Sequence, residues 1–145
     1  MVGKIVSVNI SGDKGEKKHN IEQCMLIQDK GLKDDAHAGF MHRQVSLLST
    51  DSIAKIKDKG IDVGHGDFAE NLTTEGIELY TLPVGTKLKV GGGVILRVSQ
   101  IGKECHARCA IFQQVGDCVM PREGIFAEVL TEGEVKVGDT IEVVR

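Results

Sequence analysis

The sequence predicts a mostly β protein whose strands close into a barrel with a small number of helices. Many short apolar segments alternate with polar residues, as half-buried strands do. Eighteen glycines and two prolines separate these segments, which is typical of turns between short strands. The stretches PVGTKLKV (83–90) and KVGDTIEV (136–143) both place an apolar residue and Gly before an alternating strand. Two such turns favour a closed sheet over a parallel doubly wound sheet.

The expected strands follow one another along the chain. The alternation of Val6, Val8 and Ile10 predicts the first strand, and the polar stretch SGDKGEKKHN (11–20) is expected as a hairpin tip. Cys24, in the next apolar segment, is expected to be a small core residue. The remaining strands are expected at IEQCMLI (21–27), RQVSLLS (43–49), TKLKV (86–90), VILRVSQ (94–100), IFAEVL (125–130) and TIEVV (140–144).

Helices are expected at two places. The first runs from Asp51 to Lys59, where an apolar face recurs at helical spacing between polar residues. A second short helix is expected through Arg108–Val115, in the cysteine-rich part of the chain. Thr50 or Asp51 is expected to cap the first helix. Ile53 and Ile56 are expected to form its apolar face, and Gly60 is expected to end it.

Length, charge and composition limit the functions that the chain can have. With 145 residues it is expected to form one domain, 1–145, with its own core. A net charge of −3, no Trp and one Tyr argue against nucleic acid and anionic membranes as partners. The N-terminal stretch has no long apolar run, so we expect no signal peptide, no membrane span and a cytoplasmic location. In that reducing compartment cysteines are more often catalytic, metal-binding or core residues than disulfides.

Chemically active residues concentrate in stretches that flank the expected strands. DDAHAGFMHRQVSLLS (34–49) leads into a strand, and GHGDFAENLTTEGI (64–77) is expected as a loop between regular elements. ECHARCAIFQQVGDCVMPREG (104–124) holds three of the four cysteines and ends in a turn with Arg122 and Glu123. Because loops at the ends of barrel strands combine a fixed position with access to solvent, we expect binding residues there.

The cysteine-rich stretch is compatible with more than one kind of site. Cys105 and Cys109 are four residues apart, so on a helix they share a face, and Cys118 lies beyond a Gly-Asp turn. With His106 these residues could supply four ligands to a structural zinc ion, although the second half lacks the usual ligand spacing. A disulfide is disfavoured by the reducing compartment.

A reactive thiolate is favoured by the cationic residues near the cysteines. Lys103, Arg108 and Arg122 lie close to them in sequence, and cations lower the pKa of a thiol. A thiolate is the ligand that thiophilic metals prefer and the nucleophile that carries persulfide sulfur. The same cations could bind a phosphate on an anionic ligand.

Several of these motifs together resemble the MOSC domain, which is named for its place at the C-terminus of molybdenum cofactor sulfurases. The resemblance implies a MOSC-type barrel and a role around the molybdenum cofactor, molybdopterin, a pterin whose dithiolene holds molybdenum and whose tail carries a phosphate. The motifs occur in order from about residue 30 to the end of the sequence. They are AHAG-x-x-HRQVSLL (36–48), GDFAENLTTEGI (66–77), LPVGTKLKVG (82–91), QIGKECHARC (100–109), CVMPREGIFAEVL (118–130) and VKVGDTIEV (135–143).

The resemblance also implies roles for individual residues. Cys109 is the preferred ligand of molybdenum and the preferred catalytic or sulfur-bearing residue, with Cys105 second and Cys118 third. Arg122 is the candidate for the phosphate on grounds of charge. The residues expected to bind the cofactor are His42, Arg43, Gln44, Ser46, Glu70, Asn71, Lys103, Arg108 and Arg122.

The first function that this resemblance implies is a sulfur carrier, or a component that sulfurates or delivers the cofactor, acting through a reactive cysteine. Cys109 would then ligate molybdenum or bear a persulfide, and Cys105 could resolve it. Pyridoxal phosphate binding enters only as a family-level association, because the desulfurase domain of the sulfurases is not in this sequence. A separate cysteine desulfurase or molybdenum cofactor biosynthesis proteins are therefore the expected partners.

Two alternatives remain open at this point. The chain could be a component of a molybdenum-dependent reductase of N-hydroxylated compounds. The sequence shows no flavin, iron–sulfur or nicotinamide motif, so electrons would have to come from a separate donor. It could also be a structural zinc or metal-free binding module that keeps the fold without chemistry.

Overall fold

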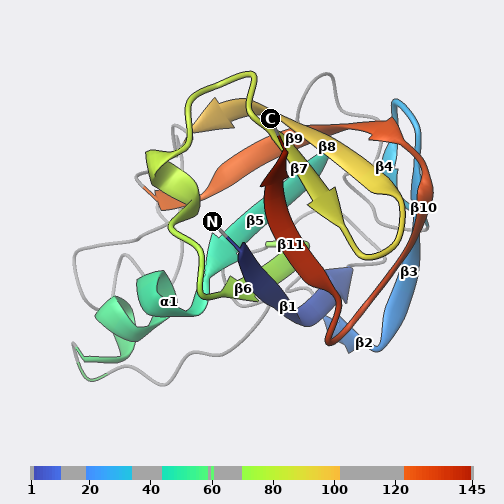
Figure 1. The fold of residues 1–145 in the computed structure, drawn as a ribbon. Helices are drawn as coiled ribbons and strands as arrows, with labels where there is room; N and C mark the ends of the chain where they lie inside the picture. The colour runs from blue at the N-terminus through green and yellow to red at the C-terminus, as the bar shows by residue number, and fades with distance from the viewer. Residues whose placement is uncertain are drawn as a thin grey trace.

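A barrel of β-strands forms the body of the molecule (Figure 1). The structure, a computed structural model, describes residues 2–10, 19–33, 44–58, 60, 70–101 and 123–144. Within these residues seven strands follow in the order β11-β7-β8-β9-β5-β6-β1, and pairing of β1 with β11 closes the ring. The predicted closed barrel with few helices is confirmed. The barrel strands are β1 (Val2–Ile10), β5 (Val45–Ser49), β6 (Leu72–Glu75), β7 (Lys87–Val90), β8 (Val94–Ile101), β9 (Ile125–Thr131) and β11 (Thr140–Val144).

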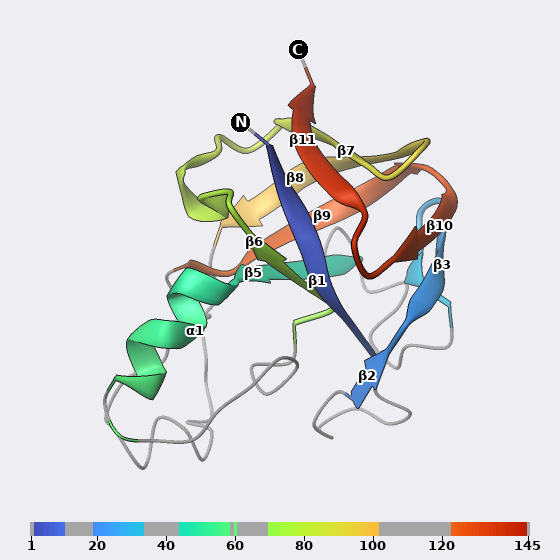
Figure 2. The same cartoon turned by 60° about the horizontal axis from the view of Figure 1, so that its bottom comes forward.

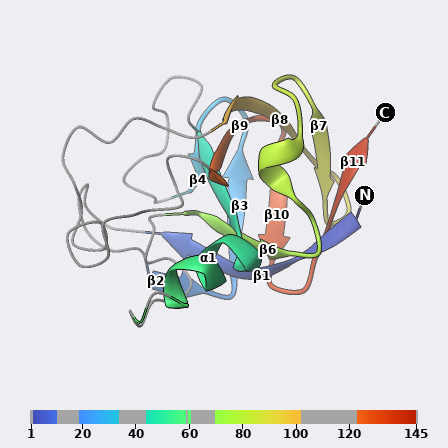
Figure 3. The same cartoon turned by 90° about the vertical axis from the view of Figure 1, so that its left-hand side faces the viewer.

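One neighbouring pair in the described barrel, β5 with β6, is parallel, and the others are antiparallel. Parallel neighbours need a crossover connection, and helix α1 (Thr50–Lys57) begins it directly after β5. Figure 3 shows α1 on the outside of the barrel, beside β6. The register pairs Leu47 with Leu72, so the start of β6 lies beside the middle of β5.

A smaller sheet stands beside the barrel, at the right of Figure 1. Its order is β10-β3-β4, formed by Gly133–Lys136, Gln23–Ile27 and Gly31–Leu32. Strand β2 (His19–Ile21) pairs antiparallel with β1, as the expected hairpin requires. The strand predicted at 21–27 is therefore interrupted at Glu22, where the chain passes from the barrel sheet to the smaller sheet. At this point the Val137 N–H donates to the carbonyl of Glu22 at 2.9 Å.

The hydrophobic core fills the interior of the barrel. In β5, Val45 and Leu47 belong to the core cluster whereas Ser46 does not, because successive side chains of a strand point to opposite faces. Cys24 also packs in this cluster, as its place in an apolar segment predicts. Outward-facing side chains are buried as well, since Ser46 is 5% exposed and Asn9 is 0% exposed. The barrel wall therefore has an apolar inner face and, in part, a buried polar outer face.

The N-terminus of α1 differs from the prediction. The cap is Ser49, and neither Thr50 nor Asp51 has that role. Ser49 is the last residue of β5, with an extended backbone (φ −85°, ψ 154°). Its Oγ accepts a hydrogen bond from the Ser52 N–H at 3.3 Å. A cap needs this extended backbone, whereas Thr50 already belongs to the helix.

The C-terminus of α1 lies at Lys57, two residues before the predicted end. Gly60 follows with φ +92°, a left-handed conformation that favours glycine, and its N–H donates to the carbonyl of Lys57 at 2.9 Å. The predicted apolar face is confirmed, because Ile53 and Ile56 are buried. With Leu48 they are buried outside the barrel core cluster, between the helix and the outer face of the wall.

Other elements were placed differently or were not predicted. The stretch 64–77, expected as a loop, contains strand β6 at residues 72–75. Strands β4 and β10 and the 3₁₀ helix η1 (Leu79–Thr81) had no counterpart in the prediction. The helix predicted through Arg108–Val115 lies outside the described residues. No helix in the described part of the chain is long and apolar enough to cross a membrane.

Candidate functional site

Described residues of the stretches that the sequence predicts to form the site lie around strand β5. On one side Ser46 pairs with Phe126 of β9, and Phe126 pairs with Gln100 of β8. On the other side Asn71, just before β6, is hydrogen-bonded to Ser46. The described residues of the stretches 36–48, 66–77, 100–109 and 118–130 therefore lie next to one another around Ser46, although they are far apart in sequence.

Ser46 and Asn71 form a closed set of hydrogen bonds. The Oδ1 of Asn71 accepts from the Ser46 N–H at 3.0 Å and from the Ser46 hydroxyl at 3.1 Å. The Asn71 N–H in turn donates to the Ser46 Oγ at 3.0 Å and to the Ser46 carbonyl at 2.9 Å. Both acceptor positions of Oδ1 are thus used, and the residues are 5% and 2% exposed.

Asn9 of β1 extends these contacts to Glu70. Its Nδ2 donates to the Glu70 carbonyl at 3.2 Å and to the Thr73 Oγ1 at 3.1 Å. The Thr73 hydroxyl donates onward to the Glu70 Oε2 at 2.8 Å. In the main chain, the Asn9 N–H donates to the Asn71 carbonyl at 2.7 Å, and the Asn71 Nδ2 donates to the Asn9 carbonyl at 3.2 Å.

We call this cluster the outer polar network, because its side chains lie on the outer face of β1, β5 and β6. Sequence reasoning included Ser46, Glu70 and Asn71 but missed the members on β1. In an alternating strand polar residues indicate the face that is not the core, and that face is usually solvated. Nothing in a single sequence indicates that this outer face is buried here. The members are Ser7, Asn9, Ser46, Glu70, Asn71 and Thr73, none more than 5% exposed.

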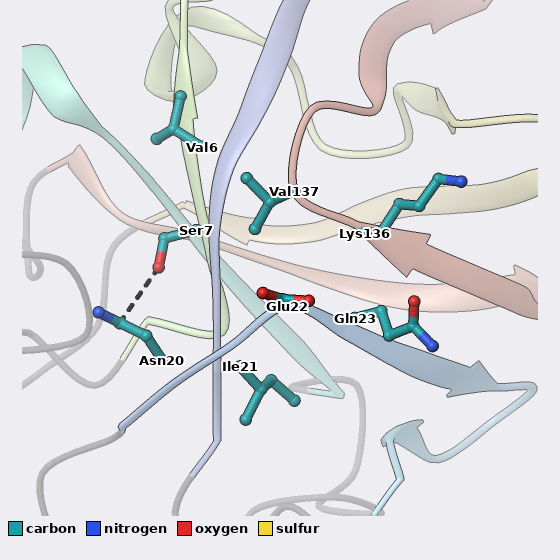
Figure 4. A pocket seen from close by; sticks show the side chains of 8 residues that line it. All are labelled: Val6, Ser7, Asn20, Ile21, Glu22, Gln23, Lys136 and Val137. Carbon is teal, nitrogen blue, oxygen red and sulfur yellow. Dashed lines mark hydrogen bonds between the residues drawn. The ribbon is translucent and has the colours of Figure 1, made fainter.

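A hollow of about 450 Å³ lies where β1, β2 and the chain after β10 meet (Figure 4). Ser7 is part of its wall, and its hydroxyl donates to the Asn9 Oδ1 at 2.6 Å or the Asn20 Oδ1 at 3.2 Å. A hydroxyl has one proton, so it serves one of these acceptors at a time. Through Ser7 the wall of this hollow is connected to the outer polar network. Its other lining residues include Val6, Ile21, Glu22, Lys136 and Val137.

A second polar cluster, which we call the Glu123 clamp, holds the downstream end of the cysteine-rich stretch. The Ser52 hydroxyl donates to the Glu123 Oε1 at 2.7 Å, and the Lys55 ammonium contacts both carboxylate oxygens at 2.9 and 2.8 Å. Lys55 also lies over the ring of Tyr80, 5.4 Å from its centroid. Because Glu123 directly follows Arg122, the clamp ties the end of this stretch to α1.

The structure describes some of the predicted cofactor-binding residues and not others. Ser46, Glu70 and Asn71 are brought together in the outer polar network. Gln44 lies two residues before Ser46, is 5% exposed, and its Oε1 accepts from the Val129 N–H of β9 at 2.9 Å. Lying outside the described residues are His42, Arg43, Lys103, Cys105, Arg108, Cys109, Cys118 and Arg122.

The described donor set fits molybdopterin in chemical type. A pterin ring carries amide-like N–H and carbonyl groups, which side-chain amides, hydroxyls and carboxylates complement. Gln44, Ser46, Glu70 and Asn71 supply these groups, and the bonds given above direct many of them into the barrel wall. The part they can play is therefore mainly to shape and support a site. In the described residues no group of three or more His, Cys, Asp or Glu side chains could hold a metal ion.

Comparison with known proteins places this fold among characterised structures. The sequence matches the family model of the MOSC domain over residues 34–142. The YuaD protein of Bacillus subtilis is similar with a TM-score of 0.83 at 19% identity, over 99% of this chain and 96% of that one. YiiM from Geobacillus stearothermophilus has a TM-score of 0.73 at 19% identity, over 99% and 75% of the two chains. For YiiM from Escherichia coli the TM-score is 0.72 at 17% identity, over 100% and 70%. Among proteins with curated descriptions, none matches the sequence.

Proposed function

The chain belongs to the MOSC domain family, and from this premise we propose that it binds molybdopterin and acts as a sulfur carrier or cofactor-delivery component through a reactive cysteine. The observation that carries the proposal is the convergence on Ser46. Four separate stretches carry the residue types that a pterin, a phosphate and a sulfur atom require. Described residues of all four meet at one place on the barrel wall.

In the proposed site the residues have different tasks. Cys109 is the thiolate that bears sulfur or meets the metal, and Cys105 is the neighbouring thiol that can resolve it. Arg122, with Lys103 and Arg108, would bind the phosphate of the tail. When bound, molybdopterin supplies a dithiolene sulfur pair that holds molybdenum. The groups proposed to surround the pterin are His42, Arg43, Gln44, Ser46, Glu70 and Asn71.

Sulfur loading would be a simple exchange at one cysteine. The Cys109 thiolate attacks the outer sulfur of a persulfide on a partner protein, such as a cysteine desulfurase. A new sulfur–sulfur bond forms on Cys109, and the partner's inner sulfur leaves as a thiolate. No electrons are gained or lost, so no further oxidant or reductant is needed.

The experiment combines mass spectrometry of the protein with metal and pterin analysis. After incubation with a cysteine desulfurase and cysteine, one added sulfur is expected on Cys109 or Cys105. Cys24→Ser is the control variant. Cys24 lies in the core, so its substitution should not change the amount of sulfur that the protein takes up. Protein made in a host that synthesises the cofactor should contain pterin and molybdenum.

The other outcomes are equally informative. No added sulfur on any cysteine, together with no bound pterin, would overturn the proposal. Zinc in place of molybdenum would favour the structural metal site. Bound cofactor without sulfur loading, but with reduction of a hydroxylamino base when an electron donor is added, would favour the reductase component.

A further inference from the structure

We propose that Asn9 is a positioning residue for Glu70 in the cofactor site, a role that rests on the function proposed above. Asn9 lies on β1, before the residues 34–142 that match the family model. It is fully buried, on the outer face of the wall. Its side chain is hydrogen-bonded to the Glu70 carbonyl and to Thr73, and we infer its effect on the site from these contacts.

The Asn9 side chain holds Glu70 in two ways. One N–H of Nδ2 donates directly to the Glu70 carbonyl at 3.2 Å. The other donates to the Thr73 Oγ1 at 3.1 Å, and the Thr73 hydroxyl in turn donates a hydrogen bond to the Glu70 Oε2 at 2.8 Å. Because Thr73 accepts from Asn9, its hydroxyl hydrogen is directed at the carboxylate. Asn9 thereby orients both the main chain and the side chain of Glu70.

The orientation of the Asn9 amide is itself determined by a neighbour. Of the two acceptors that the Ser7 hydroxyl can serve, the Asn9 Oδ1 is the nearer, at 2.6 Å against 3.2 Å for the Asn20 Oδ1, and both Ser7 and Asn9 are buried. With the carbonyl side occupied by Ser7, the NH₂ side faces Glu70 and Thr73. The chain of donors therefore runs in one direction, from Ser7 through Asn9 and Thr73 to the carboxylate of Glu70.

These contacts lie at the point where the chain enters β6. Residues 70 and 71 precede the strand, whose ladder with β1 begins at the pairing of Val8 with Leu72. The side-chain bonds of Asn9 therefore add to the ladder at the position where the predicted cofactor-facing stretch reaches the barrel. An error in the position of Glu70 would also reach Ser46, since Asn71 is its neighbour in sequence and is bonded to Ser46.

The test compares wild-type protein with Asn9→Ala and Thr73→Val, with Asn20→Ala as the matched control. Asn20 is exposed, pairs with Asn9 in the β1–β2 ladder and shares the contact with Ser7, but has no bond to Glu70. Binding of molybdopterin is measured anaerobically by pterin fluorescence. Mutation of a residue that supports a metal ligand typically weakens metal affinity about 10- to 100-fold, and we expect a loss of molybdopterin affinity of similar size for Asn9→Ala. Thr73→Val should act in the same direction but less, and Asn20→Ala should change the affinity by less than about twofold.

A double variant separates positioning from direct contact. If Asn9 acts through Glu70, then Asn9→Ala combined with Glu70→Gln should weaken binding by less than the sum of the two single losses, expressed as free energies. Additive losses would overturn the positioning role, and so would unchanged affinity in folded Asn9→Ala and Thr73→Val.

Hydrogen exchange followed by mass spectrometry provides a readout that does not need the cofactor. Asn9→Ala should speed exchange at residues 70–73 and leave β7 and β8 unchanged. No change at 70–73, or an equal rise throughout the barrel, would contradict the proposal. If wild-type protein binds no molybdopterin, the proposed function fails, and the exchange pattern still decides whether Asn9 positions Glu70.

Discussion

Two polar clusters hold the candidate site to the barrel, and they do so with different chemistry. The outer polar network consists mostly of amides and hydroxyls, and none of its members is more than 5% exposed. The Glu123 clamp is built on an ion pair in which the side chain of Lys55 is 50% exposed and that of Glu123 is 11% exposed. The outer polar network is buried and contains one ionisable side chain, Glu70. The Glu123 clamp is an ion pair that is partly exposed to solvent.

From this difference we expect burial, more than formal charge, to decide how much each cluster contributes to stability. Removing one member of a buried network leaves its partners without water and without a hydrogen bond, at a cost of about 1–3 kcal/mol for each unpaired group. An ion pair near the surface is screened by water and salt and contributes about 0–1 kcal/mol. The outer polar network should therefore be the stronger attachment, and the following changes test that order.

The largest effect is expected for Asn71→Ala. It removes the acceptor of the Ser46 N–H and hydroxyl and the donor to the Asn9 carbonyl, all of them buried. The free energy of unfolding should fall by about 3 kcal/mol or more. Urea denaturation measures it, with Asn20→Ala as the exposed control, whose effect should stay within about 0.5 kcal/mol. If Asn71→Ala lowers the free energy of unfolding no more than Asn20→Ala does, the outer polar network contributes little to stability.

Glu123→Ala should have the next largest effect, a loss of about 2 kcal/mol, because charge-assisted hydrogen bonds from two donors are removed together. The buried Ser52 hydroxyl keeps a neighbour at 3.1 Å in Ser49, which limits the damage. Repeating the denaturation in 1 M NaCl should narrow the gap to wild type, since the Debye length there is about 3 Å. The Asn71→Ala deficit should not narrow in this way. Equal salt dependence of the two variants would remove the distinction between the clusters.

Two adjacent threonines sharpen the comparison within one strand. Thr73 Oγ1 is hydrogen-bonded on both sides, whereas Thr74 Oγ1 is fully buried and has no hydrogen-bond partner among the described residues. Valine has the same shape as threonine without the hydroxyl. Thr74→Val should therefore stabilise the protein by about 1 kcal/mol, and Thr73→Val should destabilise it by about as much. The same sign for both in thermal or urea unfolding would contradict the assigned hydrogen bonds.

The smallest effect is expected for Lys55→Met, a loss of about 0.5 kcal/mol at low salt that disappears at high salt. Methionine keeps the unbranched apolar stem, so the change removes the ammonium group with its contacts to Glu123 and Tyr80. Arg97→Met is the matched control, because the side chain of Arg97 is 45% exposed and pairs with Glu128 at 3.2 Å on β8 and β9. A loss for Lys55→Met well above that of the control would mean that the ammonium has a role beyond a surface ion pair.

The sequence was sufficient for elements whose local pattern agrees with their environment. Val6 and Val8 alternate with polar residues, and β1 runs through them. Ile53 and Ile56 have helical spacing, and α1 buries both. In these cases one face meets the core or the wall, and the period of the pattern reports it directly.

The prediction was weaker where a residue's role depends on a distant partner. The segment Leu72–Glu75 contains two threonines and a glutamate and was expected as a loop, yet it is a strand because β1 and β5 pair with it on both sides. Its place in the alternating pattern assigns Asn9 only to the outer face of β1. Whether that face is buried depends on where the chain places Glu70 and Thr73. The motif of the family pointed to Ser46 and Asn71, but their mutual hydrogen bonds follow from the parallel register of β5 with β6.

The pairing of β1 with β11 has a consequence for how the protein is made. Figure 2 shows these strands side by side, with the first and last described residues of the chain close together. A ribosome that has synthesised β1 through β9 has already produced every member of the outer polar network. It has not yet produced the strand that covers the remaining edge of β1. During translation β2 can already cover the edge of β1 at Asn9, but the edge at Val2–Lys4 stays open. The barrel can therefore be sealed only after β11 emerges from the exit tunnel.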